Sequence, residues 1–305
     1  MNDPNGFLIL NKSKGCTSHD CVKQIRKILN IKKVGHAGTL DPEVTGVLPI
    51  AVGNATRFIQ YLPKVKIYFG KIQLGIKTST DDIHGEIIKT KDWPILSFKD
   101  IDESLNHFRG IIKQVPPKVS SLHVNGERAY QKSFRNEDFE LPSREVNIME
   151  LILNNWDQEK GLLDITVKCS SGTYIRSLAR DIGKSIGSEG CLSFLERTSS
   201  SGFNINKSFK LEDLHEKEKS VNKFIIPIIK TLDHLPGFIV NESKDINYWE
   251  TGRKIKCIED LIFNKKNQSQ KLIKVIDASN KLLGIGILIK GENNYLQPKI
   301  VLNAK

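Results

Sequence analysis

One segment, residues 34–42, constrains this chain more than any other. It reads Val-Gly-His-Ala-Gly-Thr-Leu-Asp-Pro, with two glycines, one imidazole, one carboxylate and a proline. Glycine adopts backbone angles closed to other residues, and Pro42 biases Asp41 toward an extended conformation. The segment predicts a shaped loop that presents His36 and Asp41, and the apolar run at 44–52 is expected to anchor it in a core. From residue types alone, a structural turn is the commoner explanation of an Asp-Pro pair.

The overall composition indicates a globular protein with a basic surplus. The chain has 305 residues, of which 39% are hydrophobic and 27% charged, and this length suits one large domain and a smaller one. The formal net charge is +11, which makes a polyanion the leading class of partner because Lys and Arg release counterions from phosphates. A basic protein from a basic proteome is the serious alternative explanation of the same number.

The cysteines and the apolar runs predict a cytoplasmic location. Five cysteines without a C-x-x-C pair indicate neither a disulfide framework nor a zinc site, which suits a reducing compartment. We find neither a secretory leader pattern nor an apolar run of membrane-spanning length, so no membrane association is expected.

Hydrophobic periodicity predicts a mixture of strands and helices. Strands are expected at 7–10, 66–74, 162–169, 272–276, 282–289 and 295–301, and helices at 19–30, 56–61, 100–109, from 174 onward and up to 195–198. Thr17 or Ser18 can cap the first helix. The polar segment 78–85 suggests a turn, because its acidic and His spacing matches no known metal loop. Beyond Leu235, short runs split by turns predict a small all-β module.

The segment 113–145 is long and irregular, and its second half mixes cations with aromatic residues such as Tyr130 and Phe134. Cations that meet phosphates and rings that stack on bases suit single-stranded or loop RNA. An ordinary surface insertion explains the same composition equally well, so residue types leave the two interpretations balanced.

Taken as a set, the motifs resemble those of the TruB-type tRNA pseudouridine synthases, which isomerise the T-loop uridine at position 55. The resemblance is carried by 35–42 with 45–49, and also by 7–15, by Tyr68, by 116–130 and by 171–176. The match is close over 1–235 and looser over the tail. Three positions depart from the family pattern: Ser13 follows Lys12 where proline is usual, His123 replaces a common lysine, and Ser79 stands where an acidic residue is frequent.

The resemblance implies an architecture and a partner. The fold expected is α+β, with a mixed, mostly antiparallel central sheet flanked by helices and a small C-terminal β-rich PUA-like domain. The catalytic domain would cover 1–235, with an RNA-binding insertion at about 113–145, and the PUA-like RNA-binding domain 236–305. The partner would be the T-stem-loop of tRNA, met by a monomer that needs neither cofactor nor metal.

The resemblance also implies site residues. Asp41 would be the catalytic carboxylate, acting as a nucleophile or as a base that abstracts a sugar proton. Arg176 would pair with it, and Tyr68 would stack on the uracil. His36 would occupy the space vacated by the uridine as it is turned out of the T-loop. The remaining expected substrate contacts are Lys12, Asp82, Ser121, Tyr130, Tyr174, Leu195 and Arg197.

Two other functions are compatible with parts of the pattern. One is an RNA chaperone that folds tRNA without chemistry, against which the complete set of Asp41, Tyr68 and Arg176 argues. The other is a hydrolase that uses His36 and Asp41 as a dyad, and the lack of a Ser or Cys in a recognised nucleophile elbow counts against it.

Overall fold

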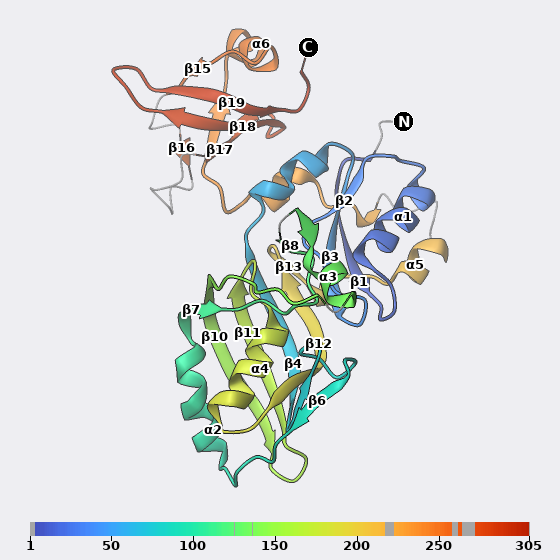
Figure 1. The fold of residues 1–305 in the computed structure, drawn as a ribbon. Coiled ribbons are helices and arrows are strands. Elements are labelled where there is room, and N and C mark those ends of the chain that lie inside the picture. The colour runs from blue at the N-terminus through green and yellow to red at the C-terminus, as the bar shows by residue number, and fades with distance from the viewer. Residues whose placement is uncertain are drawn as a thin grey trace.

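A mixed sheet forms the centre of the computed structural model, which describes residues 4–124, 126–135, 137–216, 223–257, 262–263 and 272–304. Its main path runs β1-β3-β12-β4-β11-β10-β7, with β2 beside β3 and β13 beside β12 (Figure 1). Only the β3–β12 pairing in this sheet is parallel, so the expected mostly antiparallel arrangement is confirmed. The strands are β1 (Gly6–Lys12), β2 (Val34–His36), β3 (Thr45–Val52), β4 (Val65–Leu74), β7 (Gly110–Gln114), β10 (Arg144–Asp157), β11 (Leu162–Ser170), β12 (Gly190–Ser200) and β13 (Phe203–Asn204).

The first strand is buried on both faces, which explains its unbroken apolar sequence. Successive side chains of a strand point to opposite faces. Leu8 and Leu10 accordingly join one hydrophobic cluster, whereas Phe7 and Ile9 join another. The same alternation in β3 anchors the loop that precedes it, as the apolar run at 44–52 predicts.

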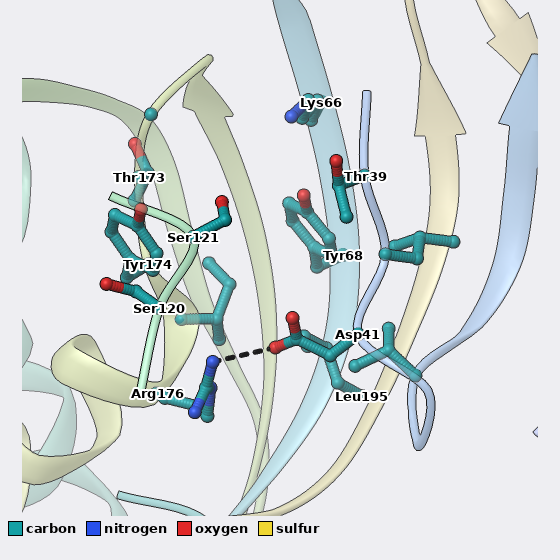
Figure 2. A pocket seen from close by; sticks show the side chains of 14 residues that line it. Thr39, Asp41, Lys66, Tyr68, Ser120, Ser121, Thr173, Tyr174, Arg176 and Leu195 are labelled. Atoms are coloured by element: carbon teal, nitrogen blue, oxygen red, sulfur yellow. Dashed lines mark ion pairs between the residues drawn. The ribbon is translucent and has the colours of Figure 1, made fainter. Parts of the chain in front are cut away.

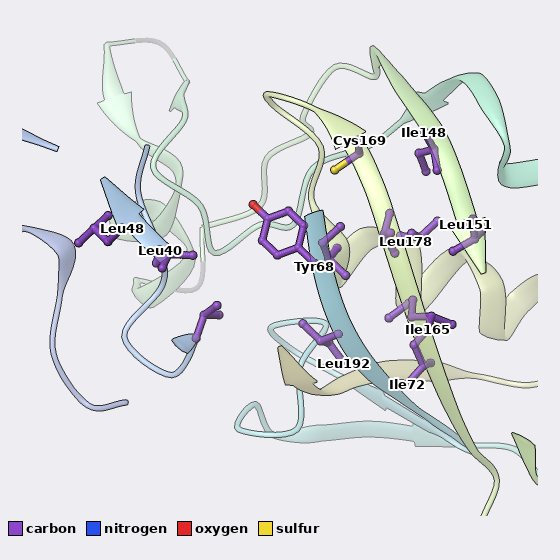
Figure 3. Close-up of a cluster of buried hydrophobic side chains, with 14 of the residues drawn as sticks. Leu40, Leu48, Tyr68, Ile72, Ile148, Leu151, Ile165, Cys169, Leu178 and Leu192 are labelled. Carbon is purple, nitrogen blue, oxygen red and sulfur yellow. The ribbon is translucent and has the colours of Figure 1, made fainter. Parts of the chain in front are cut away.

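Helices cover the sheet where their apolar faces meet it. Helix α4 packs Leu178 and Ile182 into the first cluster, beside β11 side chains such as Ile165 (Figure 3). Thr17 caps α1 through a capping box with Asp20. Of the two candidates that the sequence offered, Thr17 and Ser18, Thr17 is therefore the N-cap. The α-helices are α1 (Ser18–Leu29), α2 (Phe98–Leu105), α3 (Ala129–Phe134), α4 (Ile175–Ser185), α5 (Leu211–Glu216) and α6 (Ser243–Glu250). The 3₁₀ segments are Gly53–Tyr61, where a helix at 56–61 was expected, Asn106–Phe108, Ile205–Lys207 and Ile228–Thr231.

The expectation of a helix ending at 195–198 is wrong. These residues lie in β12, a strand between β3 and β4. Leu, Glu and Arg have high helix propensity, but pairing with two neighbouring strands overrides it. Register shifts near Phe194 and Thr198 also interrupt the period-two alternation that would have marked a strand.

The C-terminal region forms a second sheet and carries one helix, so the expectation of an all-β module is wrong in that respect. The sheet order is β15-β19-β18-β17-β14-β16. The buried indole of Trp249 on α6 fixes the helix to this sheet and donates its Nε1 hydrogen to Leu283 O, 3.2 Å away. The strands are β14 (Gly237–Val240), β15 (Ile255–Lys256), β16 (Ile262–Phe263), β17 (Leu272–Asp277), β18 (Leu282–Ile289) and β19 (Tyr295–Val301).

The second sheet shares a hydrophobic cluster with the first. Ile276, Leu282 and Ile300 belong to the same cluster as Phe7 and Phe58. The Arg57 guanidinium also donates from Nη1 to Val301 O at 2.9 Å, across the two parts of the chain. The C-terminal sheet is therefore linked to the first part of the chain through this shared cluster and through Gly53–Tyr61, the segment that carries Arg57 and Phe58.

Two small hairpins extend from the central sheet. One, β5 (Ile76–Thr78) with β6 (Ile87–Thr90), encloses the polar turn expected at 78–85. The other, β8 (His123–Val124) with β9 (Glu127–Arg128), lies in the 113–145 insertion and leads into α3. Within the residues described, none of the helices is long and apolar enough to cross a membrane.

Candidate active site

The loop that carries Asp41 is held on both sides of that residue. The backbone of Leu40 is fixed by Ser18: Leu40 N donates to Ser18 Oγ at 2.8 Å, and Ser18 Oγ donates to Leu40 O at 3.1 Å. On the other side, Pro42 O accepts from Lys12 Nζ at 3.0 Å and from Gly15 N at 2.9 Å. The Asp41 backbone is therefore fixed between two anchored neighbours.

Arg197 fixes the start of the same loop from the central strand β12. Its side chain is fully buried, with 0% exposure. The guanidinium donates from Nε to Val47 O at 2.8 Å, from Nη1 to Thr39 O at 3.2 Å and from Nη2 to Gly38 O at 3.0 Å. Gly38 has a φ of +111°, a conformation that favours glycine. One planar group thus links the loop to β3, and burial lowers the pKa of Arg197.

Asp41 and Arg176 meet although they are distant in sequence. Arg176 Nη2 lies 2.9 Å from Asp41 Oδ2, and the two side chains are 10% and 51% exposed (Figure 2). The Arg176 guanidinium also donates to Thr80 O and Val119 O, both at 3.0 Å. Arg176 therefore stands in a fixed orientation, and it is the half-exposed carboxylate that faces the solvent.

The carboxylate of Asp41 opens into a cavity of about 290 Å³. Tyr68 and Leu195 line this cavity together with Asp41 and Arg176. The Tyr68 ring lies at the border of the aliphatic cluster, and its hydroxyl points away from Ile165 (Figure 3). Burial raises the pKa of Tyr68, so the hydroxyl keeps its proton at neutral pH. The cavity thus combines an anion, a flat ring and a neutral hydroxyl.

A second cavity of about 640 Å³ continues from the first, with Asp41 and Arg176 in both walls. The 113–145 insertion supplies Ser121 and Tyr130 to its wall. The Tyr130 ring contacts Phe134 edge-on at 6.0 Å between centroids. The expected substrate-contact residues of the insertion therefore flank the approach to Asp41.

Asp82 and Tyr174 lie in the walls of the larger and the smaller cavity, respectively. Asp82 Oδ2 is 3.5 Å from Arg176 Nη1, and its other oxygen accepts from Thr80 Oγ1 at 2.8 Å and from His84 N at 3.1 Å. This is the turn that the sequence favours over a metal loop at 78–85. Tyr174 lines the smaller cavity at the start of α4, and burial raises the pKa of its hydroxyl.

His36 lies on β2 and outside the walls of both cavities. Its Nδ1 is buried without a hydrogen-bond partner, and burial, followed by the nearby Arg197, lowers its pKa. The ring is therefore neutral at pH 7. Among the described residues His36 and Asp41 share neither a hydrogen bond nor an ion pair, so the dyad required by the hydrolase alternative is not assembled.

Lys12 was expected to contact substrate, and the structure places it elsewhere. Its side chain is 1% exposed and lines neither cavity. The ammonium donates to the backbone oxygens of Ser13 at 3.0 Å, Cys16 at 2.9 Å and Pro42 at 3.0 Å. All three ammonium hydrogens are used, so Lys12 supports the Asp41 loop and has none left for an RNA phosphate.

Replacing Lys12 by methionine is expected to lower the free energy of unfolding by about 2–3 kcal/mol, because three backbone carbonyl oxygens lose their charged donor. Burial lowers the pKa of Lys12, so part of the loss is offset by removing a desolvated charge. Urea unfolding measures the change. Lys14→Met is the matched control, since Lys14 is exposed and forms an ion pair with Glu43 at 2.9 Å. Equal stability losses in both variants would contradict this role for Lys12.

Some residues that line or support the site escaped the sequence analysis, among them Gln114 and Lys66. Gln114, which is buried, donates from Nε2 to Tyr174 O at 3.1 Å and accepts from Tyr174 N at 2.8 Å, so it ties β7 to the start of α4. Lys66 lines the smaller cavity two residues before Tyr68. The alternation of a strand places residues i and i+2 on one face, and this signal could have identified Lys66.

Comparison with known proteins gives concordant matches. Residues 26–175 match a family described as "TruB family pseudouridylate synthase (N terminal domain)". The chain is 59% identical over 310 residues to "tRNA pseudouridine synthase B" of Prochlorococcus marinus (strain AS9601), with 100% of both chains covered. It is 46% identical over 309 residues to the protein of the same name from Synechococcus sp. (strain CC9311), again with 100% of both covered.

Solved structures show the same fold. A chain of a "Cbf5-Nop10-Gar1 Complex" is 25% identical with a TM-score of 0.74, and the alignment covers 99% of this chain and 86% of that one. A chain of an "H/ACA RNP bound to a substrate RNA containing 2'-deoxyuridine" is 24% identical with a TM-score of 0.72, covering 98% and 85%. This second similarity concerns the fold alone.

Proposed function

The chain belongs to the TruB family of pseudouridylate synthases, and on this premise we propose that it isomerises uridine to pseudouridine in tRNA, at the T-loop uridine of position 55. The observation that carries the proposal is the ion pair between Asp41 and Arg176 at the mouth of a cavity that also holds Tyr68. Relatives that share at least 46% of their residues over the full chain bear the name tRNA pseudouridine synthase B.

The proposed reaction needs a carboxylate at the sugar. The C1′–N1 bond breaks, the uracil turns, and a C1′–C5 bond forms, while the C5 hydrogen leaves as a proton and N1 takes up a proton in its place. Asp41 serves either as the nucleophile or as the base that removes a sugar proton. Arg176 orients the carboxylate and leaves its second oxygen toward the cavity.

Tyr68 and His36 take separate parts in handling the base. The Tyr68 ring provides a flat apolar surface for the uracil, and its protonated hydroxyl can donate a hydrogen bond. Turning the uridine out of a folded loop costs a few kcal/mol. A neutral His36 ring, set on β2 at the start of the Asp41 loop, is suited to fill the space that the uridine leaves in the RNA.

The remaining surfaces supply RNA affinity in this proposal. The net charge of +11 favours a polyanion, and the insertion and the PUA-like domain at 236–305 extend the contact beyond the catalytic domain at 1–235. Both cavities are built by a single chain, which supports a monomer as the active form. All five cysteines are free thiols, which supports action in the reducing cytoplasm.

The test uses the hydrogen that the reaction must release. A tRNA transcript carrying [5-³H]uridine is expected to lose about one equivalent of tritium per RNA, because C5 exchanges its hydrogen for the sugar bond. A T-stem-loop hairpin should react as well. Replacing the target uridine by cytidine is the control and should stop the release. Continued release from the cytidine RNA would refute the proposed position, and no release from any tRNA would refute the activity.

A further inference from the structure

Lys66 occupies one end of the smaller cavity. It lies on β4 two residues before Tyr68, so both side chains leave the same face of the central strand. Figure 2 shows Tyr68 between Asp41 and Lys66, with the Thr39 hydroxyl toward the Lys66 end. The Lys66 ammonium reaches the Asp41 loop, since a Cβ built on Gly38 would lie 3.5 Å from Lys66 Nζ, an ordinary contact distance.

Within the part of the chain that the structure describes, the Lys66 ammonium has no counterion. Among the described residues, no hydrogen bond or ion pair reaches Lys66 Nζ, whereas the Asp41 carboxylate is already engaged by Arg176. The charged groups near Lys66 include the Arg197 guanidinium, which repels it. A partly buried cation without a partner costs free energy. Such a cation is well placed for a ligand that brings its own negative charge.

We propose that Lys66, with the Thr39 hydroxyl beside it, binds a backbone phosphate flanking the uridine that enters the cavity. The inference rests on the proposed function, because it assumes an RNA substrate with its sugar at Asp41. A phosphate carries a full charge before any bond breaks, and charge-assisted hydrogen bonds to it are strong. Uracil oxygens are neutral until the glycosidic bond breaks, so they match an unpaired ammonium less well.

The burial of Lys66 also explains why a phosphate should gain more from this lysine than from an exposed one. Burial, followed by the repulsion from Arg197, lowers the pKa of Lys66 to about 8. The group stays mostly protonated at pH 7, and an incoming phosphate replaces the hydration that burial has removed. An exposed lysine such as Lys64, just before β4, keeps its hydration and gains less from a single phosphate.

The test is a double-substitution cycle measured by RNA binding. The T-stem-loop hairpin is prepared with a neutral methylphosphonate at the phosphate on the 5′ side or on the 3′ side of the target uridine. Lys66→Met, in the Asp41→Asn background that prevents turnover, is expected to weaken binding of the normal hairpin roughly tenfold or more. The same substitution should change binding by less than about twofold when the contacted phosphate is already neutral.

Two matched variants separate this contact from general attraction. Lys66→Arg keeps the charge and should recover most of the affinity, and Lys64→Met should show the same small loss with all three hairpins. Equal losses from Lys66→Met with normal and neutral hairpins would overturn the inference. A slower single turnover without any loss of affinity, in otherwise wild-type protein, would overturn it too and would indicate a contact to the base.

The pH dependence provides a second readout. The Lys66 contribution to affinity should be present at pH 7 and decline as the pH rises past about 8, while Lys66→Arg shows no such decline. The groups that face Lys66 are Arg197 on β12, Cys169 on β11 and Tyr68 on its own strand. Burial raises the pKa of Cys169 to about 11 and also raises that of Tyr68, so neither titrates in this range. A pH-independent contribution would contradict the proposal.

These readouts do not depend on turnover. If the binding cycle shows coupling but no RNA loses tritium, the phosphate contact stands and the proposed isomerisation fails. If tritium is released and the cycle shows no coupling, the isomerisation stands and the role of Lys66 fails.

Discussion

Asp41→Asn is expected to reduce tritium release by at least about 10⁴-fold, the upper range for a positioned carboxylate in proton transfer. The substitution removes the charge at nearly constant shape. Arg176 keeps its contacts to Thr80 O and Val119 O, so the site retains its geometry. Since the Asp41 side chain is 51% exposed, loss of its ion pair should change the free energy of unfolding by less than about 1 kcal/mol. Steady-state tritium release and filter binding measure the two properties separately.

Asp164→Asn provides the control for Asp41→Asn. Asp164 also forms an ion pair, 3.0 Å from Lys71 Nζ on the same sheet, but it lines neither cavity. Its loss should leave turnover within about twofold, because neither partner of this ion pair lines a cavity. Wild-type turnover in Asp41→Asn would refute the catalytic assignment, and a protein that loses RNA binding and turnover together would place Asp41 among the binding residues.

Arg197→Met should lower the free energy of unfolding by about 3–5 kcal/mol. The buried guanidinium serves Val47 O, Thr39 O and Gly38 O, and methionine leaves all three acceptors without their donor. Because two of these oxygens belong to the Asp41 loop, turnover should fall as well under conditions where the protein is still folded. Urea denaturation measures the stability, and tritium release measures the turnover.

The stability loss of Arg197→Met depends on the several N–H donors of the guanidinium and on its burial. Arg197→Lys keeps the charge but cannot reach three separate carbonyl oxygens, so it should lose an intermediate amount of stability. Arg57→Met is the matched control, because Arg57 is exposed and donates to the single carbonyl of Val301. A loss below about 1 kcal/mol for Arg197→Met would show that the loop does not depend on this side chain.

Local sequence patterns predicted most of the elements, because strand and helix periods are local properties. The expected strand at 66–74 is β4, and the expected helix at 19–30 is α1. The segment at 195–198 failed because its helix propensity competes with β pairing that only the folded sheet supplies. The helix α6 was missed for a related reason: burial of Trp249 against β18 stabilises it, and its N-cap Glu242 makes no side-chain capping hydrogen bond.

The site was predictable as a set of residues but not as an arrangement. The motifs identified Asp41 and Arg176, and the structure brings them to 2.9 Å, although their roles remain proposals. Burial could not be read from the chain, so Lys12 was expected to face the substrate and instead supports Pro42. Lys66 was not singled out, since its place in the cavity wall depends on which loops surround the strand.

The joint hydrophobic cluster of the two sheets has a mechanical consequence. Side chains of β17, β18 and β19 share one hydrophobic cluster with those of β1 and β3, and Lys274 Nζ lies 3.0 Å from Asp233 Oδ1 in the connection between the two parts. Because the two parts share this cluster, the C-terminal module has a defined position relative to the central sheet. Under the proposed function, an RNA that contacts both parts has to span the fixed distance between them.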